Sequence, residues 1–172
     1  MKFIFIRHGM TKGNEEGRYI GTTDESLSEK GINEIKKRRY PECDIVISSP
    51  MKRCIETAHL IYSDKNIEIC NNFKECDFGD FENRNYHELS RNGAYQAWID
   101  SNGTLPFPNG ESREAFIKRC VDGFYEVKEK YRDKTVALVV HGGTIMAILS
   151  VILGGEYYNY HIDNGEYIER EL

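Results

Sequence analysis

Two of the five histidines in this 172-residue chain stand at the ends of apolar runs and directly before glycine. Arg7-His8-Gly9 follows the run FIFI, and His141-Gly142 follows the run VALVV. Such runs are typical of buried parallel strands, and the glycines predict turns at their ends. Because ligands bind outside the carboxyl ends of parallel strands, both imidazoles are candidates for one active site.

Two arginines are expected at the same edge of the sheet. Arg7 directly precedes His8, and Arg53 lies about one turn into a helix that should begin with Ser49 as N-cap and Pro50 as first helical residue. Guanidinium groups bind phosphate oxygens two at a time, and a helix N-terminus favours anions. With an effective dielectric of about 20, each unit-charge contact at about 4 Å contributes roughly 4 kcal/mol before desolvation. The sequence therefore predicts a phosphate site.

A neutral histidine among these cations can attack phosphorus. Nearby positive charge disfavours the imidazolium form and lowers the pKa of the imidazole. Hydrolysis would then divide into phosphoryl transfer to one of the histidines and attack of water on the phosphorylated side chain. The two arginines and the second histidine would stabilise charge on the equatorial oxygens. This scheme requires no metal and no other cofactor.

The leaving alkoxide needs a proton, and Glu75 is the best candidate donor, because it comes just after the strand-like stretch at 67–69. Asp77 and Asp80 are weaker candidates. A carboxylic acid donates near neutral pH only if an apolar setting raises its pKa. The nearby aromatic residues Phe73, Phe78 and Phe81 could supply that setting.

The elements that position these residues follow an alternating pattern. Strand-like runs near 2–6, 43–48, 67–69 and 135–140 alternate with helical patterns near 28–39, 50–63, 84–100, 111–131 and 143–153. The alternation predicts an α/β fold, with a mostly parallel central sheet flanked by helices in three layers. The last stretch, 166–171, is expected to be an edge strand.

Length and composition favour one domain over residues 1–172. No apolar run approaches the roughly 20 residues of a membrane helix and no signal peptide is recognised, so we expect a cytoplasmic protein without a membrane partner. A net charge of -5 without a basic run argues against nucleic acid as a partner. Five cysteines without a C-x-x-C pair indicate reduced packing thiols.

The ordered motifs resemble the histidine phosphatase superfamily, also called phosphoglycerate mutase-like, along nearly the whole chain. The matching segments are Arg7 to Thr11 with Asn14, Gly17 to Asp24, Leu27 to Gly31, Ser48 to Arg53 with Thr57 and Ala58, Glu75 to Gly79, Gly110 to Ser112, and His141 to Gly143. Residues 75–83 and 95–98 are most similar to α-ribazole phosphatases and related small phosphatases. Phe81 and Asn83 depart from the usual tryptophan and glycine, which bears on substrate preference.

The resemblance implies roles for eight residues and a phosphoglycerate mutase-like three-layer fold. His8 would be the phosphorylated nucleophile and Glu75 the proton donor. His141, Arg7 and Arg53 would form the phosphate pocket, completed by Asn14, Thr11 and Gly142. Thr11 and Asn14 are equally explained as turn or capping groups.

Other conspicuous side chains are interpreted as structural. His59, His87 and His161 lack the strand-His-Gly context. The tyrosines at 157, 158 and 160 are expected to cover apolar neighbours, and Arg18, Arg38, Arg39 and Arg119 to lie on the surface or to pair with acids.

Together, the motifs predict a phosphomonoesterase that acts on a small-molecule phosphate ester, with α-ribazole phosphate as one candidate substrate. A phosphoglycerate mutase is the main alternative, and it would need further cations for a second anionic group. The only arginines or lysines between Glu75 and Glu111 are Arg84 and Arg91, and this small number favours the phosphatase over the mutase. A non-catalytic phosphate-binding module is a third reading. The sequence identifies neither the alcohol nor the oligomeric state.

Overall fold

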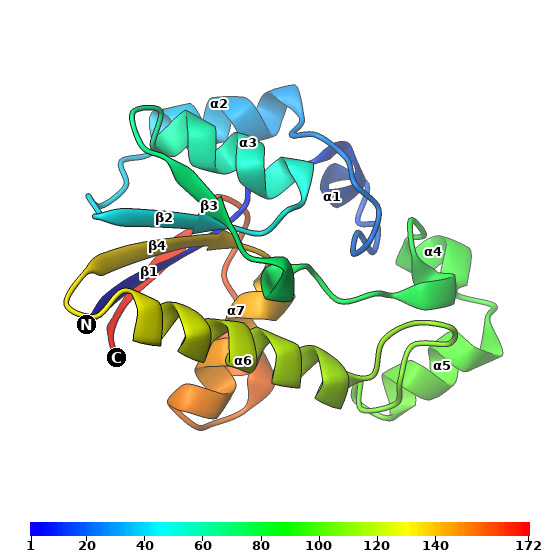
Figure 1. The fold of residues 1–172 in the computed structure, drawn as a ribbon. Coiled ribbons are helices and arrows are strands. Elements are labelled where there is room, and N and C mark those ends of the chain that lie inside the picture. Colours follow the sequence, from blue (N-terminus) through cyan, green and yellow to red (C-terminus); the bar gives the residue numbers. More distant parts are fainter.

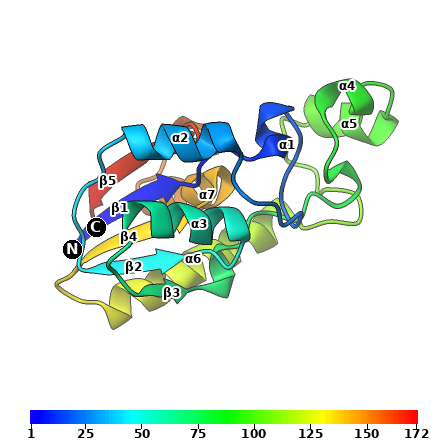
Figure 2. The same ribbon diagram turned by 90° about the horizontal axis from the view of Figure 1, so that it is seen from above.

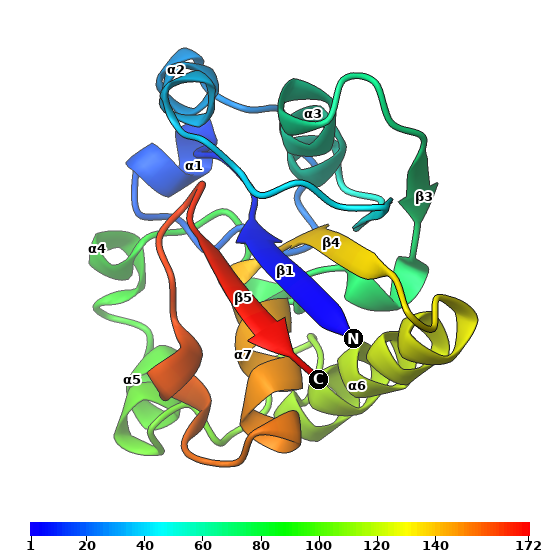
Figure 3. The same cartoon turned by 90° about the vertical axis from the view of Figure 1, so that its left-hand side faces the viewer.

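Five strands form one sheet in the order β3-β2-β4-β1-β5 in the computed structural model, which describes residues 1–172. The strands are β1 (Lys2–Arg7), β2 (Ile45–Ser48), β3 (Ile67–Ile69), β4 (Thr135–Val140) and β5 (Tyr167–Glu171). The first four are parallel, and β5 runs antiparallel to β1 at the edge, beside the two termini (Figure 3). The predicted α/β class and the C-terminal edge strand are confirmed.

Helices cover both faces of the sheet, which gives three layers (Figure 1). On one face lie α2 (Glu29–Lys37) and α3 (Lys52–Ile61), and on the other α6 (Arg113–Lys130) and α7 (Gly142–Ile152). Three shorter helices lie beyond the carboxyl ends of the strands: α1 (Lys12–Glu15), α4 (Tyr86–Leu89) and α5 (Gly93–Asp100) (Figure 2). Three-residue or four-residue 3-10 helices span Asn71–Phe73, Gly79–Phe81 and Tyr157–Tyr160.

β1 and β4 are buried from Phe3 to Ile6 and from Val136 to Val140, and their side chains alternate between the faces of the sheet. In β1, Phe3 and Phe5 pack with α6 and α7, whereas Ile4 and Ile6 pack with α3. β4 alternates in the same way and pairs with β1 up to Arg7 and Val140. Burial on both faces explains why these strands are continuous apolar runs. Their ends are therefore fixed points from which loops project.

No helix is both long and apolar enough to cross a membrane.

The single helix expected over 84–100 is wrong, because the chain forms two helices there. α4 ends at Leu89, and α5 begins at Gly93. Asn92 is the N-cap of α5, and its side-chain oxygen accepts hydrogen bonds from the backbone N–H groups of Ala94 and Tyr95. An asparagine before glycine offers the backbone a cap that ends one helix and starts another.

The expected start of α3 is also corrected. The helix begins at Lys52 with Met51 as N-cap and without a side-chain capping bond. Ser49, the expected N-cap, lies before the helix, and its hydroxyl contacts His141 instead. Arg53 is consequently in the first turn of α3, close to the carboxyl end of β2.

Candidate active site

His8 and His141 meet at the carboxyl edge of the sheet, as predicted. The backbone N–H of His8 donates to the carbonyl of Val140 at 2.9 Å, which ties the end of β1 to the end of β4. The two imidazole rings lie edge to face with centroids 5.2 Å apart. Both side chains are buried, so their protonation depends on the protein and little on bulk water.

A backbone contact fixes the tautomer of His8. Its Nδ1 lies 2.7 Å from the carbonyl oxygen of Gly9, and a carbonyl can only accept. Nδ1 therefore carries the hydrogen in the neutral ring, and Nε2 carries the lone pair. Burial, together with the charges of Arg53 and Arg7, holds the pKa of His8 well below its ordinary range. The arrangement provides a neutral imidazole with a nucleophilic nitrogen.

Arg53 is completely buried and its guanidinium group is held by the loop before α2. Nη1 donates to the carbonyl of Thr23 at 2.9 Å, and Nη2 donates to those of Gly21 at 2.9 Å and Ile20 at 3.3 Å. The remaining donor, Nε, is buried and has no acceptor in the protein. An unpaired buried donor costs about 1–3 kcal/mol, which an anion can offset.

Arg7 repeats this pattern from the end of β1. Its Nη1 donates to the carbonyl of Ile162 at 2.8 Å, and its Nε is buried without an acceptor. Only four buried side-chain polar atoms in the chain lack a partner, and two of them are these arginine Nε atoms. Both guanidinium charges act on His8, His141 and Glu75, so the five groups form one electrostatic unit.

His141 is positioned by a residue whose role the sequence reasoning missed. Ser49 Oγ lies 2.8 Å from His141 Nε2, and Cys54 Sγ lies 3.5 Å from the same nitrogen. Burial is the main cause that lowers the pKa of His141 well below its ordinary range, followed by the charge of Arg53. The motif Ser48-Ser49-Pro50 is the only local sign of this contact, and a serine before proline favours a helix cap instead.

Glu75 reaches the same centre from the segment after β3. Its Oε1 accepts from the backbone N–H of Cys76 at 2.9 Å, and its Oε2 accepts from that of Gly143 at 3.2 Å. Burial raises the pKa of Glu75, although these N–H groups and the two arginines oppose the rise. The carboxyl group therefore keeps a proton to higher pH than an exposed glutamate does.

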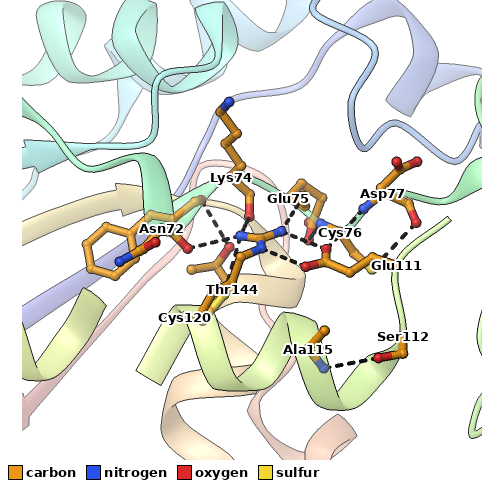
Figure 4. A network of polar contacts seen from close by, with 12 residues as sticks. Asn72, Lys74, Glu75, Cys76, Asp77, Glu111, Ser112, Ala115, Cys120 and Thr144 are labelled. Atoms are coloured by element: carbon orange, nitrogen blue, oxygen red, sulfur yellow. Dashed lines mark hydrogen bonds and ion pairs between the residues drawn. The ribbon is translucent and has the colours of Figure 1, made fainter. Parts of the chain in front are cut away.

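A second network fixes the backbone that carries Glu75 (Figure 4). Arg119 on α6 donates to the carbonyls of Asn72 at 2.9 Å, Lys74 at 2.7 Å and Glu75 at 3.0 Å. Glu111 pairs with the same guanidinium group at 2.7 Å. The expected pairing of Arg119 with an acid is confirmed, and its donation to three carbonyls makes it a positioning residue for the segment before Glu75.

Substitution of Gly143 should displace the Glu75 carboxylate. A methyl group at Gly143 would overlap Glu75 Oε1, whereas a methyl group at Gly93 would meet open space. We expect Gly143→Ala to lower kcat for alkyl phosphates by about 10- to 100-fold, since displacement of catalytic groups by about 1 Å costs up to this factor. Gly93→Ala is the matched control and should keep wild-type kcat. Equal kcat for both variants would refute this placement of Glu75.

Thr11 and Asn14 form a capping box at α1, in line with their interpretation as capping groups. Thr11 Oγ1 accepts from the backbone N–H of Asn14 at 3.2 Å, and Asn14 Oδ1 accepts from that of Thr11 at 3.1 Å. Thr11 is completely buried and does not line the cavity beside His8. Asn14 does line it, and no protein acceptor takes a hydrogen bond from its NH₂ group. Asn14 can thus cap the helix and donate to a ligand at once.

A cavity of about 270 Å³ opens from His8, Glu75 and Gly142 toward the surface. Gly142 allows close packing, because an added Cβ would come within 3.3 Å of the Arg7 guanidinium carbon. The outer walls are aromatic and consist of Tyr19, Phe78, Trp98, Phe107, Phe116, Tyr157 and Tyr158. Arg53 and His141 are not among the lining residues and lie behind them.

Three segments far apart in the sequence form the walls of the cavity. Residues 13–24 and 82–111 contribute side chains to it. The segment 157–161 was assigned no function, yet it contributes two tyrosines and His161. His161 Nε2 lies 3.3 Å from Arg7 Nη1, which agrees with a structural role beside that arginine. Arg18 lines the cavity too, although it is paired with Glu16 and Glu88.

The sequence profile of the histidine phosphatase superfamily (branch 1) matches residues 3–171. The chain belongs to this family. As a histidine phosphatase it is an enzyme, and its relatives carry phosphatase names. It is 28% identical to phosphoserine phosphatase 1 of Hydrogenobacter thermophilus, over 97% of this chain and 84% of the relative. It is also 28% identical to adenosylcobalamin/alpha-ribazole phosphatase of Escherichia coli, over 96% of this chain and 87% of that relative.

Solved structures of histidine phosphatases share the fold of this chain. The crystal structure of a putative alpha-ribazole-5'-P phosphatase from Escherichia coli superposes with a TM-score of 0.87 at 26% identity, covering 98% of this chain and 89% of the other. The phosphoglycerate mutase-like architecture expected from the sequence is therefore confirmed.

Proposed function

We propose that this histidine phosphatase hydrolyses a small phosphate monoester through a phosphohistidine on His8. The observation that carries the proposal is the neutral, buried His8 with Nδ1 bound to a carbonyl, beside two guanidinium groups with unpaired Nε donors. Nε2 forms a bond to phosphorus while the bond from phosphorus to the alcohol oxygen breaks. Glu75 gives its proton to that oxygen, and the alcohol leaves.

Water then completes the cycle. The Glu75 carboxylate, now deprotonated, takes a proton from a water molecule as the water oxygen attacks phosphorus and the bond to Nε2 breaks. Arg7, Arg53 and the Asn14 amide donate to the equatorial oxygens in both steps. His141 stabilises the charge on the phosphoryl oxygen nearest to it, and the Ser49 hydroxyl holds the His141 ring in place. Inorganic phosphate is released, and His8 returns to its neutral form.

Glu75→Gln should remove the basic limb of the pH profile. The first step needs neutral His8, so kcat/KM falls as the pH drops toward the lowered pKa of His8. It also needs protonated Glu75, so kcat/KM falls as the pH rises through the raised pKa of that group. In Glu75→Gln we expect kcat/KM for an alkyl phosphate to drop about 10²- to 10⁴-fold and the basic limb to vanish, while the acidic limb stays.

A good leaving group is the internal control for this variant. 4-Nitrophenolate needs little protonation, so the phosphorylation step for 4-nitrophenyl phosphate should slow less than about tenfold in a single-turnover measurement. Glu75→Asp shortens the side chain but keeps the acid, and should retain both limbs. If Glu75→Gln lowers the rate equally for both leaving groups and keeps a wild-type profile, Glu75 is not the proton donor.

The alcohol half of the substrate faces the aromatic walls of the cavity. These walls support α-ribazole phosphate as one candidate, since aromatic faces favour a planar group. A screen of phosphate release from α-ribazole phosphate, phosphoserine, phosphoglycerates, sugar phosphates and nucleotides tests this choice. A rate for α-ribazole phosphate well below that of other esters would exclude it as the preferred substrate.

The two arginines between Glu75 and Glu111 do not support a phosphoglycerate mutase. Arg84 and Arg91 are exposed and do not line the cavity. The decisive comparison is the rate of 3-phosphoglycerate isomerisation against the rate of phosphate release from the same substrate. Faster isomerisation would overturn the hydrolase proposal.

A further inference from the structure

Arg113 is a cavity arginine whose donors are not used by the protein. It is the first residue of α6 and is partly buried. No acid lies within ion-pair distance of its guanidinium group, and no hydrogen bond involves it. The group instead lies over the ring of Tyr157, with Cζ 4.4 Å from the centroid, and 5.7 Å from that of Tyr158.

The other partly or fully buried arginines are all engaged. Arg18 and Arg119 pair with glutamates, and Arg7 and Arg53 donate to backbone carbonyls. Arg113 differs from them because only aromatic contacts position its guanidinium group, and its five N–H groups form no hydrogen bond within the protein. Stacking on an aromatic face fixes the plane of a guanidinium group while its edge remains available for a planar bidentate acceptor.

Tyr157 connects this guanidinium group to the catalytic groups. The Tyr157 hydroxyl donates to the carbonyl of Gly143 at 3.2 Å, and the N–H of Gly143 donates to Glu75. Arg113 is thus connected to the proposed proton donor through the ring of Tyr157 and the backbone of Gly143. Because the proton donor must face the leaving oxygen, Arg113 lies on the side of the alcohol and not on the side of the phosphoryl group.

We propose that Arg113, stacked on Tyr157, is a subsite for a carboxylate on the alcohol half of the substrate; this rests on the proposed function. A carboxylate accepts two parallel N–H bonds from the guanidinium edge. Glu75 is the only carboxylate among the residues that line the cavity, and the proposed chemistry uses it as an acid. A substrate ammonium group would therefore have no carboxylate partner, so the subsite favours phosphorylated hydroxy acids over phosphorylated amino acids and over α-ribazole phosphate, which has no carboxylate.

Binding of unreactive phosphonates tests the subsite without turnover. ω-Phosphonocarboxylates with two to four methylenes are compared, by isothermal titration calorimetry, with n-alkylphosphonates that carry a methyl group in place of the carboxylate. The best carboxylate should bind wild type at least about tenfold more tightly than its methyl control, which is about 1.4 kcal/mol. Arg113→Gln should abolish this difference and leave the affinity for the alkylphosphonate unchanged. Arg113→Lys keeps the charge but not the fork, and should retain part of the preference.

Two results would overturn the subsite. One is equal binding of carboxylate and methyl compounds to wild type at every chain length. The other is a carboxylate preference that persists in Arg113→Gln. Hydrolysis assays on the same wild-type sample separate this proposal from the previous one, because a protein that prefers carboxylates but releases no phosphate from any ester would refute only the hydrolase. A protein that hydrolyses esters without the preference would refute only the subsite.

Discussion

His8→Ala should lower kcat/KM by at least about 10⁴-fold for every phosphate ester that the wild type hydrolyses, because the covalent route loses its nucleophile. We expect His141 not to replace it as the nucleophile, because its Nε2 is held by Ser49 Oγ and Cys54 Sγ. Inorganic phosphate should still bind, because both arginines remain. The measurement is kcat/KM with 4-nitrophenyl phosphate and with one alkyl phosphate.

His59→Ala is the matched control for this loss. His59 is exposed on α3, and no hydrogen bond involves its side chain, so the variant should keep wild-type activity and stability. His8→Ala with more than about 1% of wild-type kcat/KM would exceed what positioning and electrostatics alone should supply and would contradict a nucleophilic His8.

Arg53→Met should lower kcat/KM by about 10³-fold, because removal of a preorganised donor from the transition state costs about 10²–10³ in kcat, and phosphate binding weakens in addition. The variant should also lose stability, since three carbonyls of the loop at 20–23 lose their donor. Breaking such buried charged hydrogen bonds costs about 2–4 kcal/mol. Arg53→Lys keeps the charge but cannot serve three carbonyls and a phosphoryl oxygen at once, so its kcat/KM should be intermediate.

Thermal unfolding with and without phosphate separates the two effects. Phosphate should raise the Tm of wild type clearly and that of Arg53→Met little, because stabilisation of the fold by a ligand grows with the logarithm of its concentration over Kd. The exposed Arg39 provides the control substitution Arg39→Met, which should behave as wild type. An unchanged phosphate affinity in Arg53→Met would show that Arg53 supports the loop without contacting the phosphoryl group.

Most of the fold and the centre of the site could be predicted because their signals are local. The runs before His8 and His141 report burial on both faces of the sheet, and the parallel register then brings their ends together. The break at Asn92 also had a local signal, Asn-Gly, although helical periodicity on both sides concealed it. Element boundaries depend on such caps more than on periodicity.

The remaining site residues could not be found locally, because their partners are far away in the sequence. Ser49 contacts His141 across 92 positions, and Arg7 contacts His161 across 154. A serine before proline favours a helix cap until the fold places an imidazole beside its hydroxyl. Arg113 likewise becomes conspicuous only when its lack of an acidic partner is visible in three dimensions.

Rapid-quench trapping with ³²P-labelled substrate tests the phosphohistidine most directly. Wild type mixed with excess substrate should show, within the first turnover, up to one equivalent of protein-bound phosphate that is labile in acid and stable in base, located on His8 by mass spectrometry and absent from His8→Ala. Phosphate release without any trapped phosphoenzyme under conditions where hydrolysis of the intermediate limits turnover, or label on a residue other than His8, would contradict the mechanism.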